Sequence, residues 1–154
     1  MSDIAMKMGA YMVMEDATLA KMEVGLAWVR EEPHVVFLGM KTCHQPEFQV
    51  VWRVSREVLA NAAFNNVTAS DDPDFIIEPT MQALEGVPNI PAALQDTMFC
   101  HLTGLSWDDI EQNEHIIFSG QALREFLGDT DKLVPLEAVK YEAAVDVLLA
   151  DIFK

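Results

Sequence analysis

Apolar residues alternate with polar or small residues along much of the first half of the chain. The alternation is clear over Met6–Met14 and Met22–Trp28, while β-branched and aromatic residues dominate His34–Met40 and Phe48–Val54. A period of two predicts strands. Because only short polar breaks separate the four runs, they are expected to form an antiparallel meander.

The second half of the chain contains three shorter strand patterns around a proline-rich insert. Strands are expected at Phe75–Glu78, Thr97–Thr103 and His115–Ser119, with the polar stretch Ser106–Glu114 as the connection between the last two. The insert, Pro79–Asp96, holds three prolines and one glycine and is expected to be a long excursion with one helical turn. Long loops of this kind tend to be functional or mobile.

Helical spacing replaces the strand period at three places. Ser55 is a good N-cap for a helix that should stop near residues 65–66, and Ser119 is a good N-cap for a second helix with Gly128 as its C′ residue. After Pro135 the apolar spacing predicts one or two helices to the C-terminus. The expected fold is therefore α+β, with an antiparallel sheet, one helix after the fourth strand and C-terminal helices.

Composition narrows the classes of function. The chain has 154 residues, of which 51% are hydrophobic, so one packed domain over residues 1–154 is expected, with residues 79–96 as its insert. Ten Lys and Arg against 25 Asp and Glu give a net charge of −15, which disfavours binding to nucleic acid or to an anionic membrane. No apolar run approaches the ~20 residues of a membrane span, and no signal-peptide pattern is present. A cytoplasmic location is expected.

Two Cys-His dipeptides are the main candidates for chemistry. Cys43-His44 and Cys100-His101 together supply four possible zinc ligands, but the usual ligand spacing is absent and neighbours on a strand point to opposite faces. Nucleophilic catalysis by either cysteine would need a base that no motif supplies. No dinucleotide or phosphate-binding loop occurs. We therefore expect reduced, buried thiols and no metal, no cofactor and no enzymatic activity.

Methionine and tryptophan side chains provide candidate contact surfaces. Met6, Met8, Met12 and Met14 crowd one strand, where they either fill the core or lie in an oligomer interface. Trp28 and Trp52 are expected in the core. Trp107 in a polar loop, its neighbours Asp108 and Asp109, and Ile90 in the insert are the candidate partner-binding residues, although Trp107 can equally be an anchor folded back on the domain.

The order of these elements, with certain residues inside it, resembles the SsgA/SsgB family of cell-division and sporulation proteins from filamentous actinobacteria. The segments that carry the resemblance share an order and spacing with the family; they are Met12–Glu15, Val24–Trp28, Glu32–Val36, Val51–Ala60 with Trp52, Arg56 and Leu59, Ala122–Leu127 with Thr130 and Leu133–Pro135, and Asp146–Ile152. The family's glycine-rich turn is represented only by Ser70–Asp72, and the insert has no counterpart. The chain thus resembles a distant member of the SsgA/SsgB family.

The resemblance implies a strongly curved antiparallel sheet with C-terminal helices, as in the whirly single-stranded-nucleic-acid-binding proteins, assembled as a trimer. It also implies a non-enzymatic role in positioning the division septum and in recruiting division proteins such as the tubulin-like FtsZ. The charge of −15 favours protein recruitment over nucleic-acid binding. From the charge alone, an alternative is an acidic inhibitor or nucleic-acid mimic, such as a phage-encoded protein, that blocks a basic surface of a host enzyme.

Overall fold

The computed structural model describes residues 2–14, 16, 18–42, 50–71, 74–107 and 110–152. Within them one sheet of eight strands has the order β4-β3-β2-β1-β8-β7-β6-β5, and every neighbouring pair is antiparallel. The strands span β1 Ile4–Val13, β2 Leu19–Trp28, β3 Val35–Thr42, β4 Val50–Ser55, β5 Ala69–Asp71, β6 Phe75–Pro79, β7 Thr97–Trp107 and β8 Ile110–Ser119. The predicted α+β fold with a curved antiparallel sheet is confirmed.

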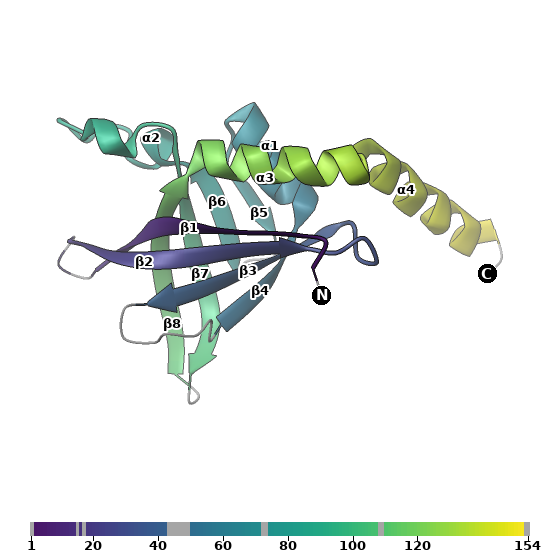
Figure 1. Ribbon diagram of the computed structural model, residues 1–154, viewed down its shortest axis with the longest axis horizontal. Coiled ribbons are helices and arrows are strands. Elements are labelled where there is room, and N and C mark those ends of the chain that lie inside the picture. The colour runs from purple at the N-terminus through teal and green to yellow at the C-terminus, as the bar shows by residue number, and fades with distance from the viewer. Residues whose placement is uncertain are drawn as a thin grey trace.

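The sheet bends strongly where the first strand meets the last. β1 pairs with β2 along its whole length but with β8 over Ala10–Met12. Figure 1 shows the strands of the β1–β4 half crossing those of the β5–β8 half. The concave faces of the two halves are therefore turned toward each other and enclose the core.

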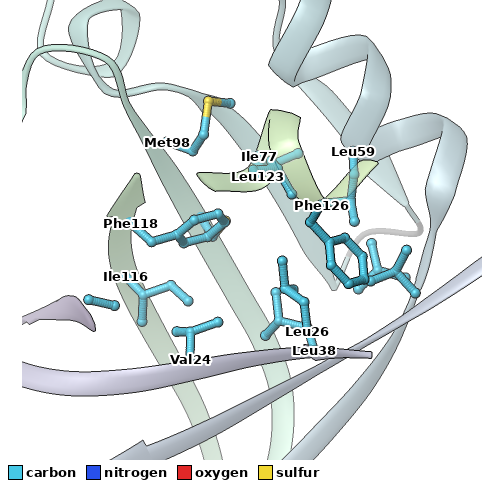
Figure 2. Close-up of a cluster of buried hydrophobic side chains, with 14 of the residues drawn as sticks. Val24, Leu26, Leu38, Leu59, Ile77, Met98, Ile116, Phe118, Leu123 and Phe126 are labelled. Atoms are coloured by element: carbon cyan, nitrogen blue, oxygen red, sulfur yellow. The ribbon is translucent and has the colours of Figure 1, made fainter. Parts of the chain in front are cut away.

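The described helices are α1 Arg56–Asn65, α2 Thr80–Ala83, α3 Gly120–Leu133 and α4 Leu136–Ile152, and a short 3₁₀ turn, η1, covers Ala92–Leu94. Of these, α1 and α3 complete the core on the concave side of the sheet. Figure 2 shows Leu59 of α1 with Leu123 and Phe126 of α3 among strand residues from both halves of the sheet. The sequence left open whether the methionines of the first strand lie in the core or in an interface. Met6, Met8 and Met12 pack against this core, whereas Met14 is 43% exposed.

Two helix starts are fixed by the serines that the sequence indicated. The Ser55 hydroxyl accepts a hydrogen bond from the Val58 N–H at 3.3 Å, and the Ser119 hydroxyl accepts one from the Ala122 N–H at 3.1 Å. Such caps satisfy backbone donors that the first turn of a helix leaves unpaired. The first helix ends as expected, because Asn66 takes the left-handed conformation with φ of 53°.

The structure corrects three local predictions. Gly128 does not end its helix, because α3 continues to Leu133. The segment Ser106–Glu114, expected as a connection, extends β7 and β8 into a long hairpin, so Trp107 belongs to a strand and not to a loop. A short strand, β5, covers Ala69–Asp71, where the sequence predicted no strand.

The proline-rich insert leaves the sheet and returns to the same point. Pro79 at the end of β6 pairs with Met98 at the start of β7, and the Thr97 hydroxyl lies 2.7 Å from the hydroxyl of buried Thr80. At the last residue of the insert, the carboxylate of Asp96 forms an ion pair with Arg124 of α3 at 2.6 Å. The insert is thus closed at its base.

Candidate protein-binding surfaces

Ile90 and Trp107, two of the four residues predicted to bind a partner, belong to different parts of the fold. Ile90 is half-buried and belongs to the insert, between α2 and η1 in the sequence and seven residues before β7 starts at Thr97. Trp107 is the last residue of β7, so roughly 33 Å of extended strand separates the two ends. Asp108 and Asp109 lie outside the described residues. The insert and the β7–β8 hairpin end are therefore two separate candidate contact regions.

Cys100 is buried among apolar residues and is not placed for catalysis. Its side chain is fully buried on the concave face, and it pairs in register with Ile77 and Ile116. Burial raises the pKa of its thiol well above the usual range, which removes the nucleophilic thiolate. The expectation of a buried thiol is confirmed for Cys100, whereas Cys43 and His44 lie outside the described residues.

We predict that Cys100 does not react with a thiol reagent while the protein is folded. In a Cys43→Ser variant, a chromogenic disulfide reagent should label Cys100 only after denaturant is added, because the thiol is both buried and protonated. The measurement is the labelling time course with and without denaturant. Prompt labelling of the native variant would show that the cysteine is accessible.

His101 points to the convex face, opposite to Cys100, and lies beside His115 of β8. The two residues are directly paired across the strands, and a ring nitrogen of one contacts a ring nitrogen of the other. Burial, and then the charge of His101, lower the pKa of His115. Since Cys100 and His101 project to opposite faces of the sheet, they do not form half of a zinc site. Among the described residues, no group of three or more His, Cys, Asp and Glu is placed to hold a metal ion.

Arg56 holds the junction between α3 and α4 against the sheet. Its guanidinium is buried and donates hydrogen bonds to the carbonyl oxygens of Pro33 at 3.1 Å and Val134 at 2.7 Å. The carboxylate of Asp131 lies 3.5 Å away, and the ring of Trp28 lies 5.7 Å from the guanidinium carbon. Burial lowers the pKa of Arg56, and Asp131 opposes that shift.

The same carboxylate starts the last helix. Asp131 accepts a hydrogen bond from the Leu136 N–H at 2.9 Å, so one side chain joins Arg56 to the first turn of α4. Leu136 and the buried Val139 line a cleft together with Val35 and Val54 of the sheet. The first turn of α4 is therefore held in place by the residues that pack beneath it.

Beyond that first turn, α4 extends away from the sheet (Figure 1) and carries an uncovered apolar stripe. Leu148, Leu149 and Ile152 are 60%, 44% and 62% exposed, and half-buried Val145 precedes them. The spacing i, i+3, i+4, i+7 places all four on one side of the helix. We call these four residues the α4 stripe. Contiguous exposed apolar surface of this kind marks an interaction site.

A second uncovered apolar surface lies on the convex face of β1–β4. Two rows of residues cross the four strands in register: Lys7, Gly25, Gly39 and Val51 form one, and Ala5, Ala27, Phe37 and Arg53 form the other. Because Gly25, Gly39 and Ala27 have small side chains or none, a groove of about 360 Å³ opens beside Phe37, Val51 and Lys7. We call it the β1–β4 groove.

The convex face that holds this groove gathers basic side chains, in contrast to the chain as a whole. Lys7, Lys21, Lys41 and Arg53 lie on the convex face of β1–β4, with Glu23 as the acidic residue among them. Lys41 Nζ lies 4.0 Å from Glu23 Oε1, and Arg53 Nη2 lies 2.5 Å from Oε1 of Glu32, which precedes β3. Four of the ten Lys and Arg residues of a chain with net charge −15 thus gather on one face.

Sequence reasoning missed the β1–β4 groove and the α4 stripe. A glycine inside a strand pattern often marks a close approach by another backbone or ligand, and Gly25 and Gly39 each interrupt an apolar strand. That signal is weak in the sequence, because only the register of β2 and β3 shows that the two glycines are neighbours. In the described part of the chain, no helix has the length and hydrophobicity needed to cross a membrane.

Comparisons with known proteins find similarity in structure and none in sequence. No protein-family model matches the chain, and no curated protein matches it by sequence. An SsgA-like sporulation-specific cell division protein from Thermobifida fusca superposes with a TM-score of 0.64 at 17% identity, covering 96% of this chain and 93% of that one. SsgB, in which mutations correlate to longitudinal cell division during sporulation of Streptomyces coelicolor, superposes with a TM-score of 0.62 at 16% identity, covering 88% and 91%.

These matches confirm the resemblance to the SsgA/SsgB family at the level of the fold. They cover almost the whole of each chain, so the likeness includes the curved sheet together with its helices. The residues that carried the resemblance in the sequence are mostly structural. Arg56, Leu59, Leu123, Phe126 and Thr130 are all buried.

Proposed function

We propose that this chain is a distant member of the SsgA/SsgB-like group and acts as a non-catalytic adaptor in cell division during sporulation. It helps to position the septum by recruiting division proteins such as FtsZ. The observation that carries the proposal is the superposition on an SsgA-like cell division protein over 96% of the chain. The net charge of −15 supports recruitment of protein over nucleic acid.

The proposal includes the location of the adaptor, its assembly and its contact residues. The adaptor is cytoplasmic, gathers at division septa and works as a homo-oligomer, with a trimer as the favoured size. The partner-binding residues are Trp107 with Asp108 and Asp109 at one end of β7, and Ile90 of the insert at the other. Aromatic side chains such as Trp107 are frequent at the centres of protein interfaces. The alternative of an acidic inhibitor stays a prediction.

The direct test is co-sedimentation with purified FtsZ from a sporulating actinobacterium, assembled with GTP. The protein should pellet with the polymers, and a fluorescent fusion should collect at sporulation septa. Trp107→Ala and Ile90→Ala probe the two candidate regions separately, because Trp107 is the last residue of β7 and Ile90 belongs to the insert that precedes the strand. Phe64→Ala, which removes an exposed aromatic ring from α1, is the matched control and should pellet normally.

The two site variants test where the contact lies, whereas the intact chain tests the proposed function. Loss of co-sedimentation in one variant alone assigns the contact to that end of the strand. Normal pelleting of both variants would show that the contact lies elsewhere. Absence of the intact chain from both the polymer pellet and the septa would contradict the proposed function itself.

A further inference from the structure

The strand β4 leaves one edge of the sheet open. Among the described residues it is the terminal strand and pairs with β3 alone. It follows one register without a bulge and contains no proline, whereas β5, at the other end of the sheet, is only three residues long. Natural proteins often protect an edge by keeping the strand short or by adding a proline or a bulge. The edge of β4 lacks these three protections.

The register shows which backbone groups of β4 face this edge. The Arg56 N–H donates a hydrogen bond to the His34 carbonyl at 2.9 Å, so these two residues face each other as a hydrogen-bonded pair. In an antiparallel ladder such pairs recur at every second residue. The N–H and C=O groups of Trp52 therefore point to β3, and those of Val51 and Arg53 point to the open edge.

The backbone of Ser55 confirms this direction and marks the end of the open edge. Ser55 follows Arg53 by two residues, and its N–H donates a hydrogen bond to the carboxylate of Asp71 in β5 at 2.6 Å. That bond occupies the last outward N–H of the strand. An added strand therefore has Val51 and Arg53 available for pairing and must leave the edge before Ser55.

A cleft lies at the point where an added strand would leave β4. Its volume of about 330 Å³ is at the small end of the range for ligand pockets. Four of its lining residues are apolar: Val35, Val54, Leu136 and Val139. The carboxylates of Glu57 and Asp71 line it as well, while the guanidinium of Arg53 is paired with Glu32. The cleft therefore fits an apolar side chain with a basic side chain close to it.

We propose that the outer edge of β4 binds an extended segment of a partner protein, which adds a strand to the sheet. The segment pairs with the outward N–H and C=O groups of Val51 and Arg53, and it places an apolar residue and a Lys or Arg at the cleft. Strand addition gains affinity from main-chain hydrogen bonds and specificity from pockets for side chains. The net charge of −15 favours a basic segment over an acidic one.

The inference is independent of the division partner, because it rests on one strand edge and the cleft at its end. The probe is a phage-displayed library of random decapeptides, panned on the full chain. Recovered peptides, labelled with fluorescein, should bind in fluorescence anisotropy and should share an apolar residue close to a Lys or Arg.

Arg53→Pro and Arg53→Thr are a matched pair of variants. Both remove the guanidinium, but only proline removes the outward N–H. An edge strand tolerates proline where the missing N–H faces solvent, so the ladder with β3 should persist. The dissociation constant of the peptides should be about 10-fold or more higher for Arg53→Pro than for Arg53→Thr, because a peptide carbonyl loses its donor. Far-ultraviolet circular dichroism checks that both variants are folded.

Methylated peptides test the same contact on the intact chain, so this test does not depend on the folding of Arg53→Pro. Methylation of alternate peptide nitrogens in one phase should abolish binding, and methylation in the other phase should preserve it, because only every second N–H of an added strand points to β4. Equal effects of the two phases, equal affinity of the two folded Arg53 variants, or a library without a binding peptide would overturn the proposal. A different mass of the two variants in solution would assign the edge to a contact between copies of this chain and would overturn it as well.

Discussion

Replacing Arg56 by methionine is expected to lower the free energy of unfolding by about 2–4 kcal/mol. The change leaves the carbonyl oxygens of Pro33 and Val134 without a donor inside the protein and leaves Asp131 without its buried partner. It also removes the cation that stacks on Trp28. Urea unfolding at a fixed protein concentration, followed by tryptophan fluorescence, measures the effect.

Arg53 offers a matched control three residues away. Its side chain is 59% exposed and forms an ion pair with Glu32 on the surface. Arg53→Met should therefore cost less than about 1 kcal/mol, as exposed ion pairs usually do. The loss of free energy of unfolding in Arg56→Lys should lie between the losses in Arg53→Met and Arg56→Met. Lysine keeps the charge but lacks the planar guanidinium that donates to two carbonyl oxygens at once. Equal stability of the Arg53 and Arg56 variants would contradict the structural role given to the buried guanidinium.

Phe126→Ala is expected to cost about 3–5 kcal/mol, the range for truncating a buried aromatic side chain. The ring is 1% exposed and lies among Leu26 and Leu38 of the sheet and Leu59 of α1 (Figure 2). Its loss leaves a cavity where α1, α3 and the β1–β4 half meet. The midpoint of urea unfolding should fall, with the slope of the transition unchanged if the variant still unfolds in two states.

Phe64→Ala makes the same chemical change at a site that is 53% exposed. It should alter the free energy of unfolding by less than about 1 kcal/mol, because surface substitutions usually have small effects. A loss of similar size in both variants would show that Phe126 does not occupy the centre of the core.

Local patterns in the sequence were sufficient for most elements. The alternation of apolar and polar residues predicted β1 to β4, and the cap residues Ser55 and Ser119 predicted where α1 and α3 start. These signals succeed because a cap or an alternating run depends on neighbouring residues only. The resemblance to the SsgA/SsgB family was visible at low identity because its residues, Arg56 and Phe126 among them, are those that the core requires.

Predictions failed where packing outweighed local preference. Gly128 disfavours a helix by about 1 kcal/mol, yet α3 continues past it because Thr130 is buried and Val134 packs against the core. The polar segment Ser106–Glu114 lacks an apolar face, yet it forms strands because β7 and β8 are already paired in register and extend together as a hairpin.

The sequence by itself therefore determined most of the strands, the capped helix starts, the acidic character and the family that the fold resembles. The tertiary structure alone decided how the sheet bends, because the pairing of β1 with β8 joins residues more than a hundred positions apart. It also decided that Gly25 and Gly39 meet in one groove and that the α4 stripe remains uncovered. Both surfaces depend on register and on helix direction, and neither property is encoded by any short run of residues.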